Sequence, residues 1–406
     1  MKHDCWRHAI QKELSALNEN GTWTLTTLPS TKKAIGCKSV FKIKYKADGS
    51  IERHKARLVA KGFTQTEGID YLETFSPVIK MTTIRVILPL ASTNNWYLHQ
   101  LDVNTAFLHG DLKEVVYMKV PPGLTVSQPN LVCKLEKSLY GLKQASRQWH
   151  AKLTAVLLQS GYTKSLADHS LFIKHVSSSF TAILVYVDDL ILTGNNMIEI
   201  TEIKKLLDNE FSIKDLGELK KFLGMEIAQS SKGILLYQRK YTLDLLEETG
   251  MLACKPCSTP MEYAGKLVHS KSGTPLADPS LYRRLIGKML YLIHTRPDLS
   301  FAVGHLSQFV SCPTNDHLDG AKIILRYLKG SISVGIFFSS ADSGFNIKGY
   351  SDSDWGGCLD TRRSVSGYCF YIGNSLISWK SKKQQVVSRS SAEAEYRALA
   401  LAACEA

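Results

Sequence analysis

The chain has 406 residues, of which 44% are hydrophobic and 21% are charged, and its formal net charge is +13. This length allows two or three domains with sizeable cores, and the composition excludes an intrinsically disordered protein. The positive charge indicates an anionic partner, most simply nucleic acid, although many basic proteins bind nothing specific. The sequence contains no secretory signal and no apolar run long enough to span a bilayer, so we expect no membrane association.

The amino-terminal residues predict an amphipathic helix, with Trp6, Ile10, Leu14 and Leu17 on one face. A mitochondrial transit peptide is the alternative interpretation, and the acidic residues within the segment argue against it.

The chain has nine cysteines without the close spacing of a metal-ligand set. Cys254 and Cys257 form a Cys-x-x-Cys pair, but no second pair or nearby histidine completes a zinc site. We therefore expect free thiols in a reducing compartment.

Strands and turns are predicted from Thr22 to about Lys46, and Asp48-Gly49 then indicates a β-hairpin whose second arm is basic. Four helices are predicted next, at residues 82–93, 146–160, 197–209 and 239–251. Pro89 is expected to kink or end the first of them. A stretch rich in Ser, Gly, Pro and Lys at 263–278 predicts a linker. Three further helices at 282–295, 299–310 and 316–328, short strands from Phe345 to Trp379, and a last helix from about Ser390 complete the pattern.

Residues 181–193 contain two apolar, β-branched runs on either side of Asp188 and Asp189. The pattern predicts a buried hairpin with two carboxylates at its tip. Adjacent carboxylates raise each other's pKa unless a cation lies between them, and a hard divalent metal such as Mg²⁺ meets that need. A solvated Asp-Asp turn is the alternative.

A third carboxylate, Asp102, ends another strand-like run, residues 96–102, and is followed by a helix-compatible Ala-Phe-Leu. Three carboxylates at strand ends suit two metal ions about 3.5–4 Å apart, the arrangement used for phosphoryl transfer.

These residues carry a family resemblance. Gln100-Leu-Asp-Val-Asn-Thr-Ala-Phe-Leu-His-Gly110 followed by Tyr186-Val-Asp-Asp189 resembles the reverse transcriptase of copia-type LTR retrotransposons. Seven further segments follow the order of that family: residues 54–62, 73–77, 138–149, 222–226, 295–298, 350–355 and 391–396. The resemblance covers nearly the whole chain.

The resemblance implies an α+β architecture: a right-hand polymerase with fingers, palm and thumb, then a helical connection, then a truncated ribonuclease H-like domain. We expect the polymerase at residues 1–262, the connection at 263–344 and the ribonuclease H-like domain at 345–406.

In the family, the aspartates corresponding to Asp102 and Asp188 hold two metal ions, Mg²⁺ or Mn²⁺, and the one corresponding to Asp189 contributes less directly. Phe107 is expected to lie under the nucleotide sugar and block a 2′ hydroxyl; a core aromatic is the alternative. Lys55 and Arg57 are candidates for binding the incoming triphosphate, and a solvated basic hairpin is the alternative.

Gly141 and Gln144 resemble the segment under the template base and nucleotide, where glycine lets the backbone approach a ligand closely; a helix-start turn is the alternative. Leu223 and Gly224 resemble a hairpin that grips the primer end, although a tight turn in the core would look the same. Lys214 is a candidate proton donor to the leaving pyrophosphate.

Residues 350–355 and 393–399 resemble the first two acidic motifs of ribonuclease H, with Asp352 and Glu395 as the matching carboxylates. The later acidic motifs of that domain have no counterpart before Ala406. We therefore expect this site to be inactive and its core to be incomplete.

The predicted function is RNA-directed DNA polymerisation by two-metal nucleotidyl transfer to a primer 3′ hydroxyl. The implied partners are an RNA template, a DNA or tRNA primer, the RNA–DNA hybrid and deoxynucleoside triphosphates. The implied location is a cytoplasmic virus-like particle, with the nucleus as an alternative. Two rival hypotheses are a relic of an element that only binds nucleic acid, and a different two-metal enzyme such as a nucleotidyl cyclase.

Overall fold

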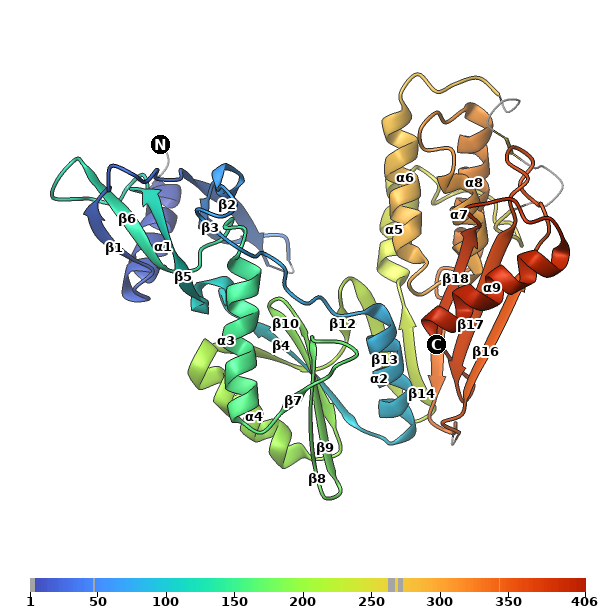
Figure 1. Ribbon diagram of the computed structural model, residues 1–406, viewed down its shortest axis with the longest axis horizontal. Helices are drawn as coiled ribbons and strands as arrows, with labels where there is room; N and C mark the ends of the chain where they lie inside the picture. Colours follow the sequence, from blue (N-terminus) through green and yellow to red (C-terminus); the bar gives the residue numbers. More distant parts are fainter. Residues whose placement is uncertain (1–3, 47, 262–266, 269–272, 343) are drawn as a thin grey trace. The chain divides into compact units, whose positions relative to one another are not determined.

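The structure, a computed structural model, describes residues 4–46, 48–261, 267–268, 273–342 and 344–406. It is a mixed α and β protein whose chain forms two compact units. The first unit comprises Met1–Ile79 and His99–Gly217, and the second comprises Lys80–Leu98 and Glu218–Ala406. Figure 1 labels the elements of both units.

The amino-terminal part of the first unit contains the helix α1 (Asp4–Glu19), a three-stranded sheet of order β1-β6-β5 and the hairpin β2–β3. Leu14 and Leu17 of α1 are buried in a core that they share with this sheet and with β3, as the amphipathic pattern predicted. The five strands are β1 (Trp23–Thr27), β2 (Cys37–Tyr45), β3 (Ile51–Ala60), β5 (Asp111–Lys119) and β6 (Leu131–Lys137). The hairpin expected at Asp48-Gly49 is confirmed, because β2 and β3 pair antiparallel on either side of it.

The central element of the first unit is a six-stranded sheet of order β11-β4-β10-β9-β8-β7. Its strands are β4 (Tyr97–Val103), β7 (Thr163–Lys164), β8 (Leu171–Val176), β9 (Ser179–Tyr186), β10 (Asp189–Gly194) and β11 (Ile213–Glu218). The helices α3 (Ala145–Gln159) and α4 (Met197–Phe211) share one hydrophobic core with alternate residues of β4, β9 and β10. Because side chains alternate along a strand, this core assigns one face of the sheet to the helices and leaves the intervening residues on the other face.

Two short 3-10 helices, η1 (Gly62–Thr64) and η2 (Ala106–His109), complete the first unit. The first of them begins two residues after β3 ends. The second of them comes three residues after β4 and carries Phe107.

The second unit begins with α2 (Met81–Thr93), which packs against a four-stranded antiparallel sheet of order β12-β13-β14-β15. The strands are β12 (Lys221–Phe222), β13 (Met225–Ser230), β14 (Gly233–Tyr237) and β15 (Gly335–Ser339). Pro89 was expected to kink or end this helix; α2 does not end there, because it continues to Thr93. Pro89 and its neighbours are buried, so tertiary packing offsets the hydrogen bond that proline cannot donate.

Arg85 of α2 is buried, and it joins distant parts of the second unit. Its guanidinium donates a hydrogen bond of 3.0 Å to the backbone carbonyl of His294 and stacks 3.9 Å from the centre of the Trp379 ring. Burial lowers the pKa of Arg85 to about 10. Because a buried cation is costly without such partners, these contacts make α2 part of the second unit.

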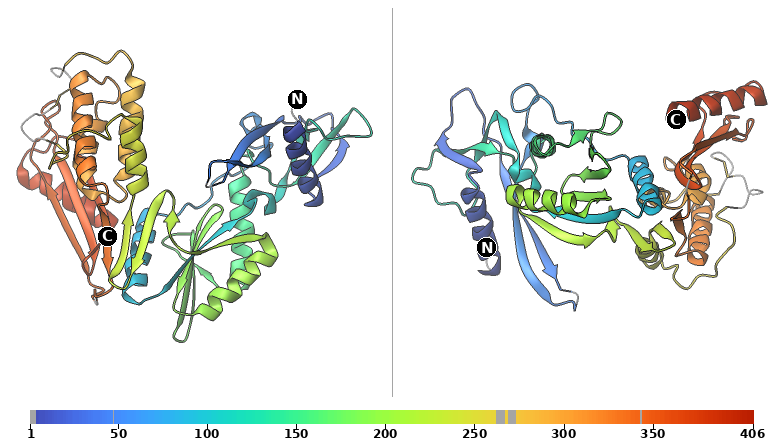
Figure 2. Two further views of the ribbon diagram at one scale, coloured as in Figure 1. Left: turned by 180° about the vertical axis from the view of Figure 1, so that it is seen from behind. Right: turned by 90° about the horizontal axis from the view of Figure 1, so that it is seen from below.

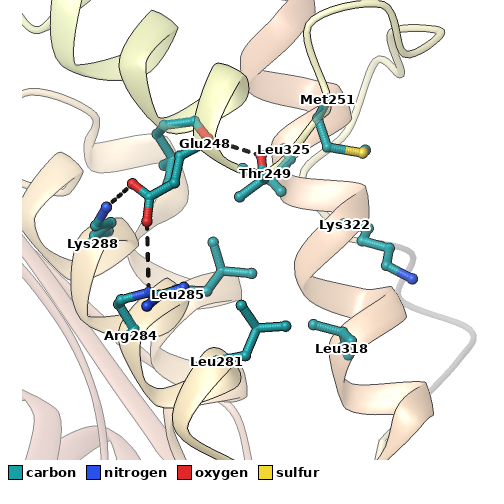
Figure 3. Close-up of a pocket in the computed structure, with 11 residues that line it drawn as sticks. Glu248, Thr249, Met251, Leu281, Arg284, Leu285, Lys288, Leu318, Lys322 and Leu325 are labelled. Carbon is teal, nitrogen blue, oxygen red and sulfur yellow. Dashed lines mark hydrogen bonds and ion pairs between the residues drawn. The ribbon is translucent and has the colours of Figure 1, made fainter.

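The helices α5 (Arg239–Glu248), α6 (Pro279–Leu292), α7 (Ser300–Ser307) and α8 (Asn315–Gly330), with the 3-10 helix η3 (Pro297–Leu299), share a second hydrophobic core. A pocket of about 300 Å³ lies among α5, α6 and α8, and on its rim Glu248 forms ion pairs with Arg284 and Lys288 (Figure 3). Residues on both sides of the domain boundary expected at 262/263 contribute to this core, and the boundary position itself lies outside the described residues. Part of the linker expected at 263–278 lies outside the described residues.

The carboxy-terminal part of the second unit is a three-stranded antiparallel sheet of order β16-β17-β18 with one helix, α9 (Ser391–Glu405). The strands are β16 (Ile347–Ser353), β17 (Val365–Ile372) and β18 (Ser375–Lys383). Figure 2 shows α9 along one face of this sheet. The buried stripe of α9 consists of Ala394, Ala398 and Ala402, whose small side chains let the helix approach the strands closely.

The predicted helices are present, with ends that differ by a few residues. α5, for example, was expected to reach Met251 but ends at Glu248, and Gly250 follows with a left-handed φ of +68°. Among the described residues, no helix combines the length and the apolar character that crossing a bilayer requires.

The first turn of α4 supplies a test of the fold. Asn196 is the N-cap of this helix, and its side-chain oxygen accepts hydrogen bonds from the backbone N–H of Ile198 at 3.0 Å and of Glu199 at 3.2 Å. We expect Asn196→Ala to lower the free energy of unfolding by about 1 kcal/mol, measured by urea denaturation. Asn209→Ala, on the exposed surface of the same helix, is the control and should be nearly neutral. Equal losses in both variants would contradict the prediction.

Candidate active site

The hairpin β9–β10 presents the acidic pair, but the two aspartates occupy different positions. Asp189 pairs with Tyr186 across the hairpin, so the two turn residues are Val187 and Asp188. The expectation that both carboxylates lie at the tip is therefore wrong for Asp189, which is the first residue of β10. Val187 adopts a left-handed φ of +54°, a rare conformation for a β-branched residue, and such strain is typical of functional sites.

Two hydrogen bonds hold this strained turn. The buried indole of Trp149, on α3, donates to the backbone carbonyl of Val187 at 2.6 Å. The backbone N–H of Val103, on β4, donates to the carbonyl of Asp188 at 2.8 Å. The turn is thus bound both to the helix layer and to the neighbouring strand, which positions the Asp188 carboxylate.

Asp102 lies on β4, the neighbour of β10 in the sheet. The residues on either side of it, Leu101 and Val103, face the core under α3 and α4, so Asp102 projects from the opposite face. Asp189 precedes the core residue Leu190 and projects from the same face as Asp102. Strand pairing and side-chain alternation therefore place these two carboxylates on one face of adjacent strands, although 87 positions separate them in the sequence numbering.

The electrostatics of the three carboxylates agree with this placement. Burial raises the pKa of the Asp102 carboxyl, and the charge of Asp188 raises it further. Burial also raises the pKa of Asp189. A hydrogen bond of 3.4 Å from the Gln100 amide opposes that increase, and the charges of Asp188 and Asp102 add to it. All three groups therefore repel one another when ionised, which is the condition that a bound cation relieves.

Cations of the first unit also act on Asp102. The charges of Lys214, Lys55 and Arg57 lower its pKa, in opposition to burial. Burial lowers the pKa of Lys55, and the neighbouring Arg57 and Arg53 lower it further. Arg57 lies over the ring of Tyr140, 4.7 Å from its centre. The structure thus places both triphosphate candidates near the carboxylates.

Phe107 lies on η2, just after Thr105, which has a left-handed φ of 53°. Its ring meets the ring of Tyr140 edge-on, with 5.2 Å between the ring centres. The side chain is half-buried and packs against the two hydrophobic cores of the first unit. This position is compatible both with a core aromatic and with a surface under a nucleotide sugar.

Gly141 and Gln144 lie in a loop that is held by contacts with other segments of the first unit. Gly141 has φ +89°, and a Cβ atom there would clash with the backbone carbonyl of Ala60. The Gln144 side chain is fully buried: its oxygen accepts a hydrogen bond from the Gln65 amide at 3.0 Å, and its nitrogen donates to the Asp70 carbonyl at 3.1 Å. The close approach at Gly141 is therefore made to protein backbone, and Gln144 holds the loop.

The donor set suits a hard divalent cation, because three carboxylates provide oxygen ligands and carry mutual repulsion. Within the described ranges, however, no group of three or more His, Cys, Asp or Glu side chains is arranged closely enough to hold a metal ion. The fit therefore rests on ligand chemistry and on the raised pKa values of Asp102 and Asp189.

Residues 20–263 match the family model described as reverse transcriptase (RNA-dependent DNA polymerase). The chain belongs to the reverse transcriptase family. The match covers the whole first unit except its amino-terminal helix, and it includes all three carboxylates.

The present chain is similar to retrotransposon proteins over nearly its whole length. This similarity confirms the expected resemblance to copia-type Pol polyproteins. The retrovirus-related Pol polyprotein from transposon RE2 of Arabidopsis thaliana is 47% identical over 98% of this chain and 28% of that protein. The corresponding polyprotein from transposon TNT 1-94 of Nicotiana tabacum is 42% identical over 96% of this chain and 30% of that protein. The chain thus spans less than a third of the length of these relatives.

Solved structures are more distant from this reverse transcriptase family member. One is a foamy viral protease-reverse transcriptase in complex with dsDNA, with 13% identity and a TM-score of 0.30. The match covers all of this chain and 70% of the foamy viral chain. A Candida albicans telomerase has 10% identity and a TM-score of 0.29, over 80% of this chain and 65% of that one.

The other predicted site residues lie in the second unit of the present chain. Leu223 and Gly224 form the turn between β12 and β13, with φ +49° and +74°. The Tyr291 hydroxyl, on α6, donates a hydrogen bond to the Leu223 carbonyl, so a helix supports this turn. Asp352 on β16 and Glu395 on α9 are both exposed.

Sequence reasoning missed the residues that support the site: Trp149, Val187, Gln65 and Tyr291. Trp149 closes the quoted segment 138–149, so its presence there was visible, but its indole hydrogen bond to the turn was not. Val187 also stands within the quoted motif 186–189, but its left-handed conformation was not visible there. Gln65 and Tyr291 carry no signal in a single sequence, because each acts through a contact to a distant amide or backbone carbonyl.

Gly141→Ala should destabilise the protein by more than about 2 kcal/mol, because it combines left-handed strain with a clash against the Ala60 carbonyl. Gly21 is the matched control. It has φ +65° but open space around it, so Gly21→Ala should cost only the strain, about 1 kcal/mol. Urea denaturation measures both variants, and equal costs would show that the contact with Ala60 contributes nothing.

Asp189→Asn should stabilise the protein at neutral pH by about 0.5 kcal/mol, because it removes an ionised carboxylate from a repulsive cluster while its oxygen still accepts the Gln100 hydrogen bond. A raised pKa means that the folded state binds the proton more tightly than the unfolded state. The wild type therefore gains stability as the pH falls through the raised pKa, and the advantage of the variant disappears there.

Thermal unfolding without divalent cations, followed against pH, measures this difference. Asp208→Asn, at an exposed site on α4, is the charge control and should not change the pH profile. A variant less stable than the wild type at neutral pH would contradict the repulsion argument.

Proposed function

We propose that the chain is an RNA-directed DNA polymerase of a copia-type retrotransposon that extends a primer 3′ hydroxyl by two-metal nucleotidyl transfer. The observation that carries the proposal is the trio of Asp102, Asp188 and Asp189 on adjacent strands of one sheet, within a segment that matches the reverse transcriptase family. The repulsion among the three supports a role as metal ligands.

The corresponding architecture is a right hand. We assign the six-stranded sheet with α3 and α4 to the palm, and the hairpin β2–β3 with the neighbouring three-stranded sheet to the fingers. The helices α5 to α8 share one core, which favours a single thumb that extends beyond the expected boundary at 262. Residues 345–406 correspond to a ribonuclease H-like portion.

In this mechanism Asp102, Asp188 and Asp189 would hold two Mg²⁺ or Mn²⁺ ions. When bound, such ions supply Lewis acidity toward the 3′ hydroxyl and neutralise the charge of the triphosphate. The chain's own task is positioning. Trp149 and Val103 fix the turn that carries Asp188, and Gln100 orients Asp189.

The incoming deoxynucleoside triphosphate would meet the cations on β3. Lys55 and Arg57 both act electrostatically on Asp102, which supports a role for each of them in binding the phosphates. Arg57 is already oriented by its stacking on Tyr140, which favours it as the fixed contact and Lys55 as the adaptable one. Phe107, packed edge-on against the same tyrosine, would limit space at the sugar 2′ position.

The remaining predicted residues have supporting roles. Gly141 and Gln144 hold the loop beneath the nucleotide through backbone and amide contacts. The Leu223–Gly224 turn, supported by Tyr291, would contact the primer of a duplex whose template is RNA. Lys214 acts electrostatically on Asp102 and remains the candidate proton donor to pyrophosphate.

At the ribonuclease H-like portion we propose that Asp352 and Glu395 are two of the carboxylates of a site. We propose a cytoplasmic virus-like particle, or alternatively the nucleus, as the place of action.

The test is extension of a DNA primer on an RNA template with Mg²⁺ or Mn²⁺. Asp188→Asn combined with Asp189→Asn should lower synthesis more than about a thousandfold, because the ions lose their ligands. Binding of the RNA–DNA duplex should be unchanged or slightly tighter, because two negative charges are removed.

Asp208→Asn combined with Glu210→Gln on the exposed face of α4 is the control for the same change in charge, and synthesis should persist. A folded wild-type chain that binds duplex without synthesis would establish the nucleic-acid-binding relic instead. Pyrophosphate release without primer or template would indicate a nucleotidyl cyclase.

A further inference from the structure

The pocket among α5, α6 and α8 is lined mainly by apolar side chains. Its volume is about 300 Å³, and Figure 3 shows Leu281 and Leu285 of α6 facing Leu318 of α8 across it. Leu285 is buried in the core that the helices share, whereas Leu281 is 46% exposed. Ligand pockets in proteins are concave, mostly apolar and about 300 Å³ or larger, so this pocket suits an apolar ligand.

The rim of the pocket carries two cations and one carboxylate where α5 meets α6. One oxygen of the Glu248 carboxylate accepts a hydrogen bond from the Lys288 ammonium, and the other lies 3.6 Å from Nε of Arg284. The hydrogen bond from Lys288 lowers the pKa of Glu248, so this carboxylate is ionised at neutral pH. One negative charge is thus shared between two positive charges, which leaves the rim with an excess of positive charge.

Arg284 is the rim cation that can accept a further partner. Its contact with Glu248 is longer than a hydrogen bond and its side chain is 62% exposed, so its N–H groups are available to a second carboxylate. Lys322 lines the α8 side of the pocket, but Figure 3 shows its ammonium turned away, and it forms an ion pair of 2.8 Å with Asp319. The anionic group of a ligand therefore belongs at Arg284.

The volume of the pocket limits the size of its ligand. A water molecule takes up about 30 Å³ in the liquid, so the pocket holds about ten non-hydrogen atoms. A carboxylate on an unbranched chain of about eight carbons matches this volume. Only one or two side chains of a partner protein would fit in the same space, which favours a small molecule over a docked polypeptide.

We propose that the pocket among α5, α6 and α8 binds a small anionic amphiphile, an apolar chain with one terminal carboxylate. The chain contacts Leu281, Leu285 and Leu318, and the carboxylate binds the guanidinium of Arg284. Burial of a short chain and one charge-assisted contact supply the affinity, so the dissociation constant is on the order of 0.5 mM.

Titration of the full chain with octanoate, followed by ligand-observed NMR, tests the proposal. Octanoate should bind saturably. 1-Octanol has the same chain without the charge and should bind about tenfold more weakly, because it lacks the charge-assisted contact with Arg284. Acetate has the charge without the chain and should show no binding at millimolar concentrations, because it buries almost no apolar surface.

Three charge variants locate the binding site. Arg284→Gln should weaken octanoate binding about tenfold and leave 1-octanol binding unchanged. Arg283→Gln is the matched control on the same helix, because the Arg283 guanidinium donates to the carbonyls of Val310 and Ser311, which do not line the pocket. Glu248→Gln should strengthen octanoate binding about threefold, because it removes the carboxylate that competes for Arg284. Damage to the fold would weaken binding, so this increase separates the proposal from a structural effect.

Three outcomes would overturn the proposal: no saturable binding of octanoate, binding that Arg284→Gln leaves unchanged, or weaker binding in Glu248→Gln. Absence of octanoate binding together with a loss of RNA–DNA duplex affinity in Arg284→Gln would assign the rim to nucleic acid instead. None of the octanoate measurements depends on polymerase activity, so this proposal and the proposed function stand or fall separately.

Discussion

The constraint on which the candidate active site depends is the repulsion among Asp102, Asp188 and Asp189. Burial and mutual charge raise the pKa of Asp102 and of Asp189, so the folded chain holds these groups together at a cost in free energy. The surrounding structure supplies what offsets that cost. Trp149 and Val103 donate hydrogen bonds to the turn that carries Asp188, and the turn keeps Val187 in a left-handed conformation. Strain and repulsion at one place are typical of a site arranged for a ligand that relieves them.

The architecture of the first unit follows from this requirement. Alternate residues of β4, β9 and β10 are apolar and face α3 and α4, which anchors the sheet on one side. The intervening residues are then free to be polar, and they carry Asp102 and Asp189 on the opposite face. The cations of β3 and Lys214 moderate the repulsion without removing it. The same charges would attract a triphosphate, so the field around the carboxylates suits both metal and substrate.

The second unit is organised by different forces. α2 precedes the strand of Asp102 in the sequence, yet its buried Arg85 binds His294 and Trp379, which belong to distant segments. The helices α5 to α8 share one core across the position where a domain boundary was expected. The small carboxy-terminal sheet buries one face under α9. Apolar burial thus sets the limits of the units more than sequence order does.

The sequence by itself determined the elements with strong periodicity or turn chemistry, such as the β2–β3 hairpin at Asp48-Gly49 and the helix that carries Leu14 and Leu17. It also determined which carboxylates are candidates, because apolar strands flank Asp102 and Asp188. Only the tertiary structure decided that Asp189 belongs to a strand, that α2 continues through Pro89, and that Gln144 is buried. The reason is physical: strand register, the burial that offsets a lost hydrogen bond, and amide partners such as Gln65 depend on residues far apart in the chain, which no local pattern records.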